Sequence, residues 1–305
     1  MHNTSSHLRW LLTTAAFALL LLGLVEGNYR YGVRCPRNEI DAKLLDLERV
    51  NGKHFRVVLF SDSMTHNPAR SFQMADDVLD LTTTNGPTLL GIKFMLQRLY
   101  GAGGSVEDAV VFLRPEFFNF DPAQAVNWIF LYFNREEELA ELSQYGTRGY
   151  VSYEVYLRNR LDALNFSNYL LTRSRLTKVP FDGQYVLEKG VVADHLKTVD
   201  DADFGATATA QRIVRTLTAL CERNGTRLTY VLEPLTSEDH RRVPGSDFER
   251  FFQRLADSSP GVRYLDASNL ATFPDEAFFD GVHPRQNWGK YYLAIIDRRV
   301  VRLFR

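Results

Sequence analysis

The chain has 305 residues, of which 45% are hydrophobic and 12% aromatic, so it can bury a large core as one α/β domain with insertions or as two small domains. A formal net charge of -1 gives no electrostatic reason to expect nucleic acid as a partner. The sequence also lacks the His-Glu-x-x-His motif of zinc hydrolases, the Gly-Lys-Ser/Thr phosphate loop and the Gly-x-Ser-x-Gly elbow of α/β-hydrolases. Zinc hydrolysis and nucleoside triphosphate chemistry therefore have no support, and the missing elbow argues against an α/β-hydrolase.

The N-terminus carries a targeting signal. Residues 10–25 form an uninterrupted run of apolar, Thr and Gly residues, with Arg9 before it and Glu26 after it. Sixteen such residues are at the upper limit of a signal-peptide core and slightly short of a membrane-spanning helix. We therefore expect residues 1–27 to be a signal peptide or a retained membrane anchor, and the body to be periplasmic or at the cell surface.

An exported location bears on the two cysteines. Cys35 and Cys221 are isolated and lack the spacing of a metal site. An oxidising compartment would permit a disulfide between them, but two cysteines do not establish one. The pairing stays open.

The folded part is expected to begin after an exposed lead-in, residues 28–54, that contains one short helix at residues 39–50. From residue 55 onward, apolar strands alternate with helical patterns. Strands are predicted at residues 55–60, 78–84, 109–113, 227–232 and 261–266, and helices at residues 89–100, 207–223 and 288–304. The glycine-rich residues 101–104 are expected to form a helix end and loop. This alternation predicts a parallel sheet with helices on both faces across residues 55–305.

Residues 121–205 interrupt the alternation. Within them, residues 128–133 and 150–171 are aromatic, have helical spacing and are too long for a simple crossover. We interpret the segment as a helical insertion. Such an insertion tends to cover the catalytic edge of a sheet and to shape the choice of substrate.

Two short motifs carry the candidate chemistry. Ser61, Asp62 and Ser63 follow the strand at residues 55–60, so Ser63 is expected at the carboxyl edge of the sheet, where ligands bind in such folds. Asp280 and His283 are three residues apart, so the carboxylate can bond one imidazole nitrogen while the other faces a hydroxyl from elsewhere. Taken singly, the Ser-Asp-Ser motif also fits an ordinary turn or helix cap, His283 a surface or capping histidine, and Asp280 a loop acid.

Together the two motifs resemble the Gly-Asp-Ser and Asp-x-x-His blocks of the SGNH (GDSL-type) hydrolase superfamily, with Ser61 in place of the leading glycine. The resemblance implies a flavodoxin-like fold and no cofactor. It also implies that Ser63 is the nucleophile, His283 the general base and Asp280 the group that orients the imidazole.

The same resemblance implies oxyanion donors at the amide of Ser63, at a glycine after the second strand and at an asparagine after the next one. Gly86 and Asn119 are the candidates for the last two positions. Gly86 also fits a plain turn glycine. The Gly-x-Asn-Asp motif that the family usually has at this position is absent around Asn119.

These observations predict an exported serine esterase or O-acyltransferase that acts on an acyl ester, with acylated cell-surface carbohydrate as a substrate class. The membrane-tethered SGNH relatives that modify cell-surface polysaccharides have a similar plan of hydrophobic N-terminus, core and large insertion. If uncleaved, the N-terminal segment makes the membrane a second partner. The alternative is a non-catalytic glycan-binding or envelope-assembly subunit built on the same fold.

Overall fold

The computed structural model of the protein describes residues 4–31, 39–61, 63–69, 71–83, 88–115, 118, 133, 135–142, 144–145, 204–267, 273–279 and 283–305. In these residues the strands form one five-stranded sheet in which every neighbouring pair is parallel. The strands are β1 (His54–Phe60), β2 (Val78–Asp80), β3 (Ser105–Leu113), β4 (Arg227–Leu232) and β5 (Val262–Asp266). Their order in the sheet, β2-β1-β3-β4-β5, is that of flavodoxin-like folds. The predicted α/β class with a parallel sheet is confirmed.

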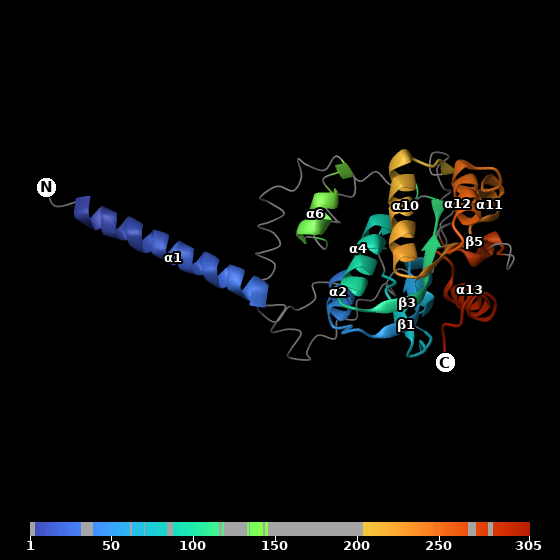
Figure 1. Ribbon diagram of the computed structural model, residues 1–305, viewed down its shortest axis with the longest axis horizontal. Coiled ribbons are helices and arrows are strands. Elements are labelled where there is room, and N and C mark those ends of the chain that lie inside the picture. Colours follow the sequence, from blue (N-terminus) through green and yellow to red (C-terminus); the bar gives the residue numbers. More distant parts are fainter. Residues whose placement is uncertain are drawn as a thin grey trace.

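Helices cover both faces of the sheet (Figure 1). One face packs against α2 (Glu39–Glu48), α4 (Thr88–Gly101), α10 (Ala208–Arg223) and α12 (Asp247–Ser258). The other packs against α3 (Ser63–Ala69) and α13 (Gln286–Arg299). Alternation along β1 explains the two cores, because Val58 and Phe60 enter the first while Val57 and Leu59 enter the second.

The first helix of the body differs from the expected exposed lead-in. In α2, Ile40, Leu44 and Leu47 are buried in the same core as α4. These apolar residues recur at intervals of four and three, so one side of the helix covers the sheet. The expectation of an exposed lead-in is therefore wrong for α2.

The last helix is shorter than predicted. It ends at Arg299, and the chain then turns back, so that Phe304 forms an antiparallel bridge with Met74. The carboxylate of Asp297 holds this reversal by accepting the amides of Leu303 at 2.6 Å and Phe304 at 3.0 Å. The predicted helix over residues 288–304 is wrong at its C-terminal end, because a side chain offers those amides a better acceptor than the next helical turn.

Strand β2 is also shorter than the predicted residues 78–84. It ends at Asp80, whose carboxylate accepts the backbone amide of Thr82 at 2.9 Å and the hydroxyl of Thr82 at 2.6 Å. The chain beyond Asp80 nevertheless stays beside β1, because the amides of Leu81 and Thr83 donate to the carbonyls of Leu59 and Ser61 at 2.9 and 3.0 Å. A further helix, α11 (Ser237–Arg242), and α12 have no counterpart among the predicted elements.

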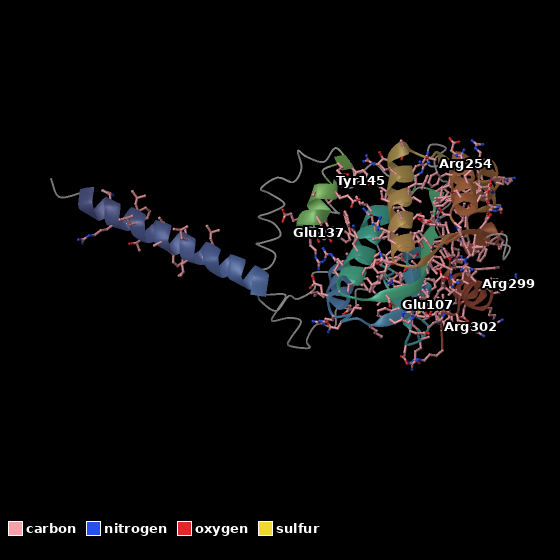
Figure 2. The ribbon with its side chains drawn as sticks, in the orientation of Figure 1. Glu107, Glu137, Tyr145, Arg254, Arg299 and Arg302 are labelled. Atoms are coloured by element: carbon pink, nitrogen blue, oxygen red, sulfur yellow. The ribbon has the colours of Figure 1, made fainter. Side chains whose placement is uncertain are left out.

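The predicted insertion, residues 121–205, lies largely outside the described residues. Helix α6 (Glu136–Leu142) belongs to it and packs on α4 through two ion pairs of low exposure. In one, Arg98 binds both carboxylate oxygens of Glu138, at 2.6 and 2.8 Å. In the other, Lys93 pairs with Glu141. Figure 2 shows Glu137 of α6 and Tyr145 on this side of the body.

The N-terminal residues form a long helix, α1 (Thr4–Tyr31), drawn in Figure 1 away from the sheet. Several of its large apolar side chains are exposed, among them Trp10, Leu11, Leu12, Phe17 and Leu19. Within the described part of the chain, no helix combines the length and the apolarity that crossing a membrane requires.

Candidate active site

The carboxyl edge of the sheet gathers polar side chains. Because the strands are parallel, the residues that end or follow them meet at one edge. These residues are Ser61 after β1, Thr82 after β2, Arg114 after β3, Glu233 after β4 and Asp266 at the end of β5. Ser61, Thr82, Arg114 and Glu233 are all buried. Polar groups buried in this way need hydrogen-bond partners within the protein.

Glu233 organises the centre of this edge. Its Oε1 atom accepts the hydroxyl of Ser61 at 3.0 Å and the hydroxyl of Thr65, in α3, at 2.5 Å. Its backbone amide donates to the carbonyl of Leu113 at 2.8 Å, which continues the pairing of β3 with β4. The carboxylate is fully buried and is held on the end of a central strand.

A second chain of hydrogen bonds reaches α3 from the β2 side. The hydroxyl proton of Thr82 is donated to Asp80, so the Thr82 oxygen is an acceptor toward Nδ1 of His66, 2.9 Å away. This geometry assigns a proton to Nδ1 of His66. The ammonium of Lys43 lies 3.4 Å from the Asp80 carboxylate and supplies the opposite charge. Thr65 and His66 are thus anchored to β4 and β2.

Ser63, the predicted nucleophile, is the first residue of α3, immediately beyond β1. Its backbone therefore lies at the expected edge. His283 is half-buried and lies three residues before α13. Its carbonyl accepts a hydrogen bond from the amide of Phe279 at 2.8 Å. The side chain of Ser63, together with Asp280, Gly86 and Asn119, lies outside the described residues, so the Ser63 to His283 hydrogen bond stays a prediction.

The two helices associated with Ser63 and His283 pack against each other. Helix α3 starts at the carboxyl edge, three residues after β1, and α13 runs from that side toward the opposite edge, where the chain beyond it bridges Phe304 to Met74 ahead of β2. The two helices approach so closely that Pro68 of α3 lies against Gly289 of α13. The structure thereby brings the backbones of Ser63 and His283 to the same edge and the same face of the sheet.

Another histidine and acid meet at this edge. Nε2 of His240, in α11, lies 3.1 Å from Oδ2 of Asp266 at the end of β5. Nearby, the pKa of the Tyr292 phenol is well above its usual value, chiefly because of burial and further because of the negative charges of Glu233 and Asp266. The hydroxyl of Tyr292 is therefore neutral at physiological pH and is not a base.

Sequence reasoning missed Glu233, Asp266, His240 and His66. For Glu233 a signal was available, because an acid that directly follows the apolar strand at residues 227–232 falls at the carboxyl edge of a parallel sheet. Arg114 stands in the same position after β3. The partners of these residues belong to other elements of the fold, so the sequence spacing within a motif does not predict them.

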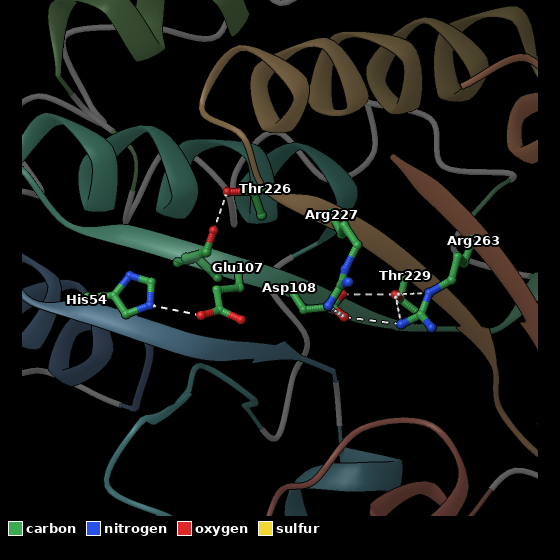
Figure 3. A network of polar contacts seen from close by, with 8 residues as sticks. His54, Glu107, Asp108, Thr226, Arg227, Thr229 and Arg263 are labelled. Atoms are coloured by element: carbon green, nitrogen blue, oxygen red, sulfur yellow. Dashed lines mark hydrogen bonds and ion pairs between the residues drawn. The ribbon is translucent and has the colours of Figure 1, made fainter. Parts of the chain in front are cut away.

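A different polar network lies toward the opposite ends of the strands (Figure 3). There the buried carboxylate of Asp108 accepts the hydroxyl of Thr229 at 2.9 Å and a guanidinium nitrogen of Arg263 at 3.1 Å. Arg227 lies 3.3 Å from the same carboxylate, and the nearby pair of His54 and Glu107 is exposed. The Asp108 network compensates a buried charge within the sheet and takes no part in the carboxyl edge.

An open groove of about 550 Å³ between α10 and α12 contains none of the edge residues. Its lining includes Arg215, Glu222, Phe251 and Arg254. Among the residues that the structure describes, no group of three or more His, Cys, Asp or Glu side chains is placed to hold a metal ion.

Comparison with known proteins identifies no relative from which a function could be inferred. The chain matches no protein-family model and no curated protein. The parallel sheet and the placement of Ser63 and His283 are therefore the observations on which a function can be based.

Proposed function

We propose that the chain is an exported SGNH-type serine esterase or O-acyltransferase. Ser63 attacks the carbonyl of an acyl ester, His283 accepts the hydroxyl proton and returns it to the leaving alcohol, and Asp280 orients the imidazole. Water or a sugar hydroxyl then attacks the acyl-enzyme, takes the acyl group and releases Ser63 as its free hydroxyl. The amides of Ser63 and Gly86, with Asn119, hold the oxyanion, and loss of one such donor costs about 2.7 to 4 kcal/mol in the barrier.

The observation that carries this proposal is the packing of α3 on α13. Ser63 begins α3, and His283 lies three residues before α13. Pro68 is five residues beyond Ser63, and its partner Gly289 is six residues beyond His283. Because α3 begins at Ser63 and α13 at Gln286, this contact lies within the first two turns of both helices. This arrangement supports a meeting of the two side chains.

A fluorophosphonate probe tests the chemistry, since it modifies only an activated serine. We expect the parent protein to be labelled and Ser63→Ala to be unlabelled and inactive on p-nitrophenyl acetate. Ser71→Ala is the matched control, because Ser71 is exposed and lies eight residues further along. A folded parent that is neither labelled nor active would exclude the esterase and favour the non-catalytic glycan-binding subunit.

The geometry offers a second test. In an experimental structure, Oγ of Ser63 should lie within about 3.5 Å of the His283 ring, with Asp280 on the other side of that ring. A separation beyond about 8 Å would exceed what side-chain rotation can close. Such a result would exclude Ser63 and His283 as a pair.

Export is part of the proposal, with an acylated cell-surface polysaccharide as the substrate class. The exposed apolar side chains of α1 support it, because so much apolar surface is unfavourable in water. A reporter enzyme that works only outside the cytoplasm, fused after Arg305, should be active, and deletion of residues 1–27 should silence it. Retention on membranes after a carbonate wash would distinguish an anchor from a cleaved signal peptide. An inactive reporter on the full chain would contradict export.

A further inference from the structure

Two hydroxyls flank the proposed nucleophile and bind the same atom. Ser61 lies two residues before Ser63 and Thr65 two residues after it. Both hydroxyls donate to Oε1 of Glu233, at 3.0 and 2.5 Å. One carboxylate oxygen, more than 160 residues further along the chain, thereby closes the turn that carries Ser63.

All three members of this contact are shielded from water. Thr65 and Glu233 are 0% exposed and Ser61 is 3% exposed. In such a low-dielectric place hydrogen bonds are strong, and an unpaired partner is costly, so the contact is worth more than a similar one at the surface. Glu233 itself is held by its backbone bond to Leu113 at the end of β4. The acceptor is therefore on a rigid element.

Helix α3 needs such support. It has seven residues, and isolated helices of that length are unstable in water. It also contains Pro68, which has no amide to donate to a preceding turn. Thr65 anchors it to Glu233, and His66 anchors it to Thr82 on the β2 side. The two bonds come from opposite directions and fix the rotation of the helix about its axis.

We propose that Glu233 is a positioning residue for Ser63. The proposal rests on the proposed serine chemistry and adds that Glu233 acts through Ser61 and Thr65, without contact to the substrate. It also gives a reason for Ser61, since a glycine at that position would have no hydroxyl to donate. A misplacement of a reacting group by about 1 Å can lower a rate by about a hundredfold, so a loosened turn should be visible in kcat.

The test compares two buried threonines that each bind a buried carboxylate. Thr65→Val removes the bond to Glu233, and Thr229→Val removes the 2.9 Å bond to Asp108 as the matched control. Three readouts are needed: the fluorophosphonate labelling rate of Ser63, kcat and KM for p-nitrophenyl acetate, and hydrogen exchange of the amides in α3.

For Thr65→Val we expect labelling and kcat to fall at least about tenfold with KM little changed, together with faster exchange in α3. Thr229→Val should keep the parental labelling rate and the parental exchange of α3, although it loses the bond to Asp108 and the bonds that its hydroxyl accepts from Arg263. Glu233→Gln should retain more activity than Glu233→Ala, because the amide oxygen can still accept both hydroxyls.

The outcomes separate the two proposals. A labelled parent in which folded Thr65→Val reacts and exchanges like the parent overturns the positioning role and leaves the serine chemistry intact. A parent that is unlabelled at Ser63 overturns the serine chemistry and the positioning role together. Faster α3 exchange in Thr65→Val with parental labelling also overturns the role, because the turn would then be loosened without consequence for Ser63.

Discussion

Gly289 in α13 lies against Pro68 in α3, such that a β-carbon at Gly289 would be 2.4 Å from Cγ of the proline. The proline ring is rigid, so the helices themselves must separate to admit a methyl group. We expect Gly289→Ala to lower the free energy of unfolding by about 1 to 3 kcal/mol, as overpacking does. It should also slow fluorophosphonate labelling, since the helices near Ser63 and His283 move apart.

Gly101→Ala is the control for this experiment. No atom lies within 4 Å of a β-carbon built at Gly101, the last residue of α4. Its stability, measured by urea denaturation beside that of Gly289→Ala, should be unchanged or slightly higher. Equal stability of the two variants would contradict the close packing of α3 on α13.

Cys221 should be unreactive in the folded protein. It is a buried free thiol in α10, and burial raises its pKa to about 12, so almost none of it is the nucleophilic thiolate at pH 8. Iodoacetamide at pH 8 followed by mass spectrometry should find the Cys221 peptide unmodified, and modified after unfolding in urea. Rapid modification of the native protein would show that the α10 core opens.

Asp297 should give the C-terminal reversal an acid-sensitive contribution to stability. Burial raises the pKa of its carboxyl, but hydrogen bonds from the amides of Leu303 and Phe304 and the contact with Arg302 outweigh burial, so the net pKa is lowered. A lowered folded-state pKa stabilises the fold above the unfolded value of about 3.9, and this contribution is lost as the pH falls through the folded value.

We therefore expect Asp297→Ala to be less stable than the parent by about 1 to 3 kcal/mol at pH 7, and the difference to shrink below about pH 4. Denaturation at pH 7 and pH 3 measures both values. Asp257→Ala, which changes an exposed aspartate in α12, serves as control and should show little difference at either pH. A difference that grew in acid would contradict the direction of the shift.

The ion pair between Arg98 and Glu138 should contribute more to stability than an exposed ion pair does. The two side chains are 6% and 2% exposed, and Glu138→Gln would leave the arginine charge buried without its full counter-charge. We expect Glu138→Gln to lower the free energy of unfolding by about 3 kcal/mol. The loss should be measured either as faster hydrogen exchange of the α6 amides or as lower global stability. Glu107→Gln, in the exposed pair with His54, should cost less than about 1 kcal/mol. Similar losses in both variants would contradict this ranking.

The sheet could be predicted from the sequence because its strands are buried on both faces and appear as continuous apolar runs. The predicted strand at residues 227–232 has the observed ends of β4. Errors arose where a side chain overrides the pattern. Asp297 ends α13 early by binding the amides of two later residues. The predicted strand at residues 78–84 differs less, because Leu81 and Thr83 lie beyond β2 but still donate their amides to the chain of β1 and Ser61.

The site could be predicted only in outline. The placement of Ser63 beyond the first strand follows from local sequence, and the structure has α3 beginning there. The anchoring of its neighbours to Glu233 spans 168 and 172 residues, and no local pattern indicates it. Contacts of this kind depend on the strand order, which brings the ends of β1 and β4 to one edge.

The bridge between Met74 and Phe304 has a consequence for the order in which the protein is completed during synthesis. Phe72 stacks on Phe304 with ring centroids 4.3 Å apart, and Asp76 pairs with Arg305 across 229 residues. The segment beside β2 emerges early from the ribosome but can reach its native contacts only after residues 303–305 have been made. This margin of the sheet is therefore among the last parts to close, and a chain interrupted before residue 303 leaves Phe72 without the ring on which it stacks.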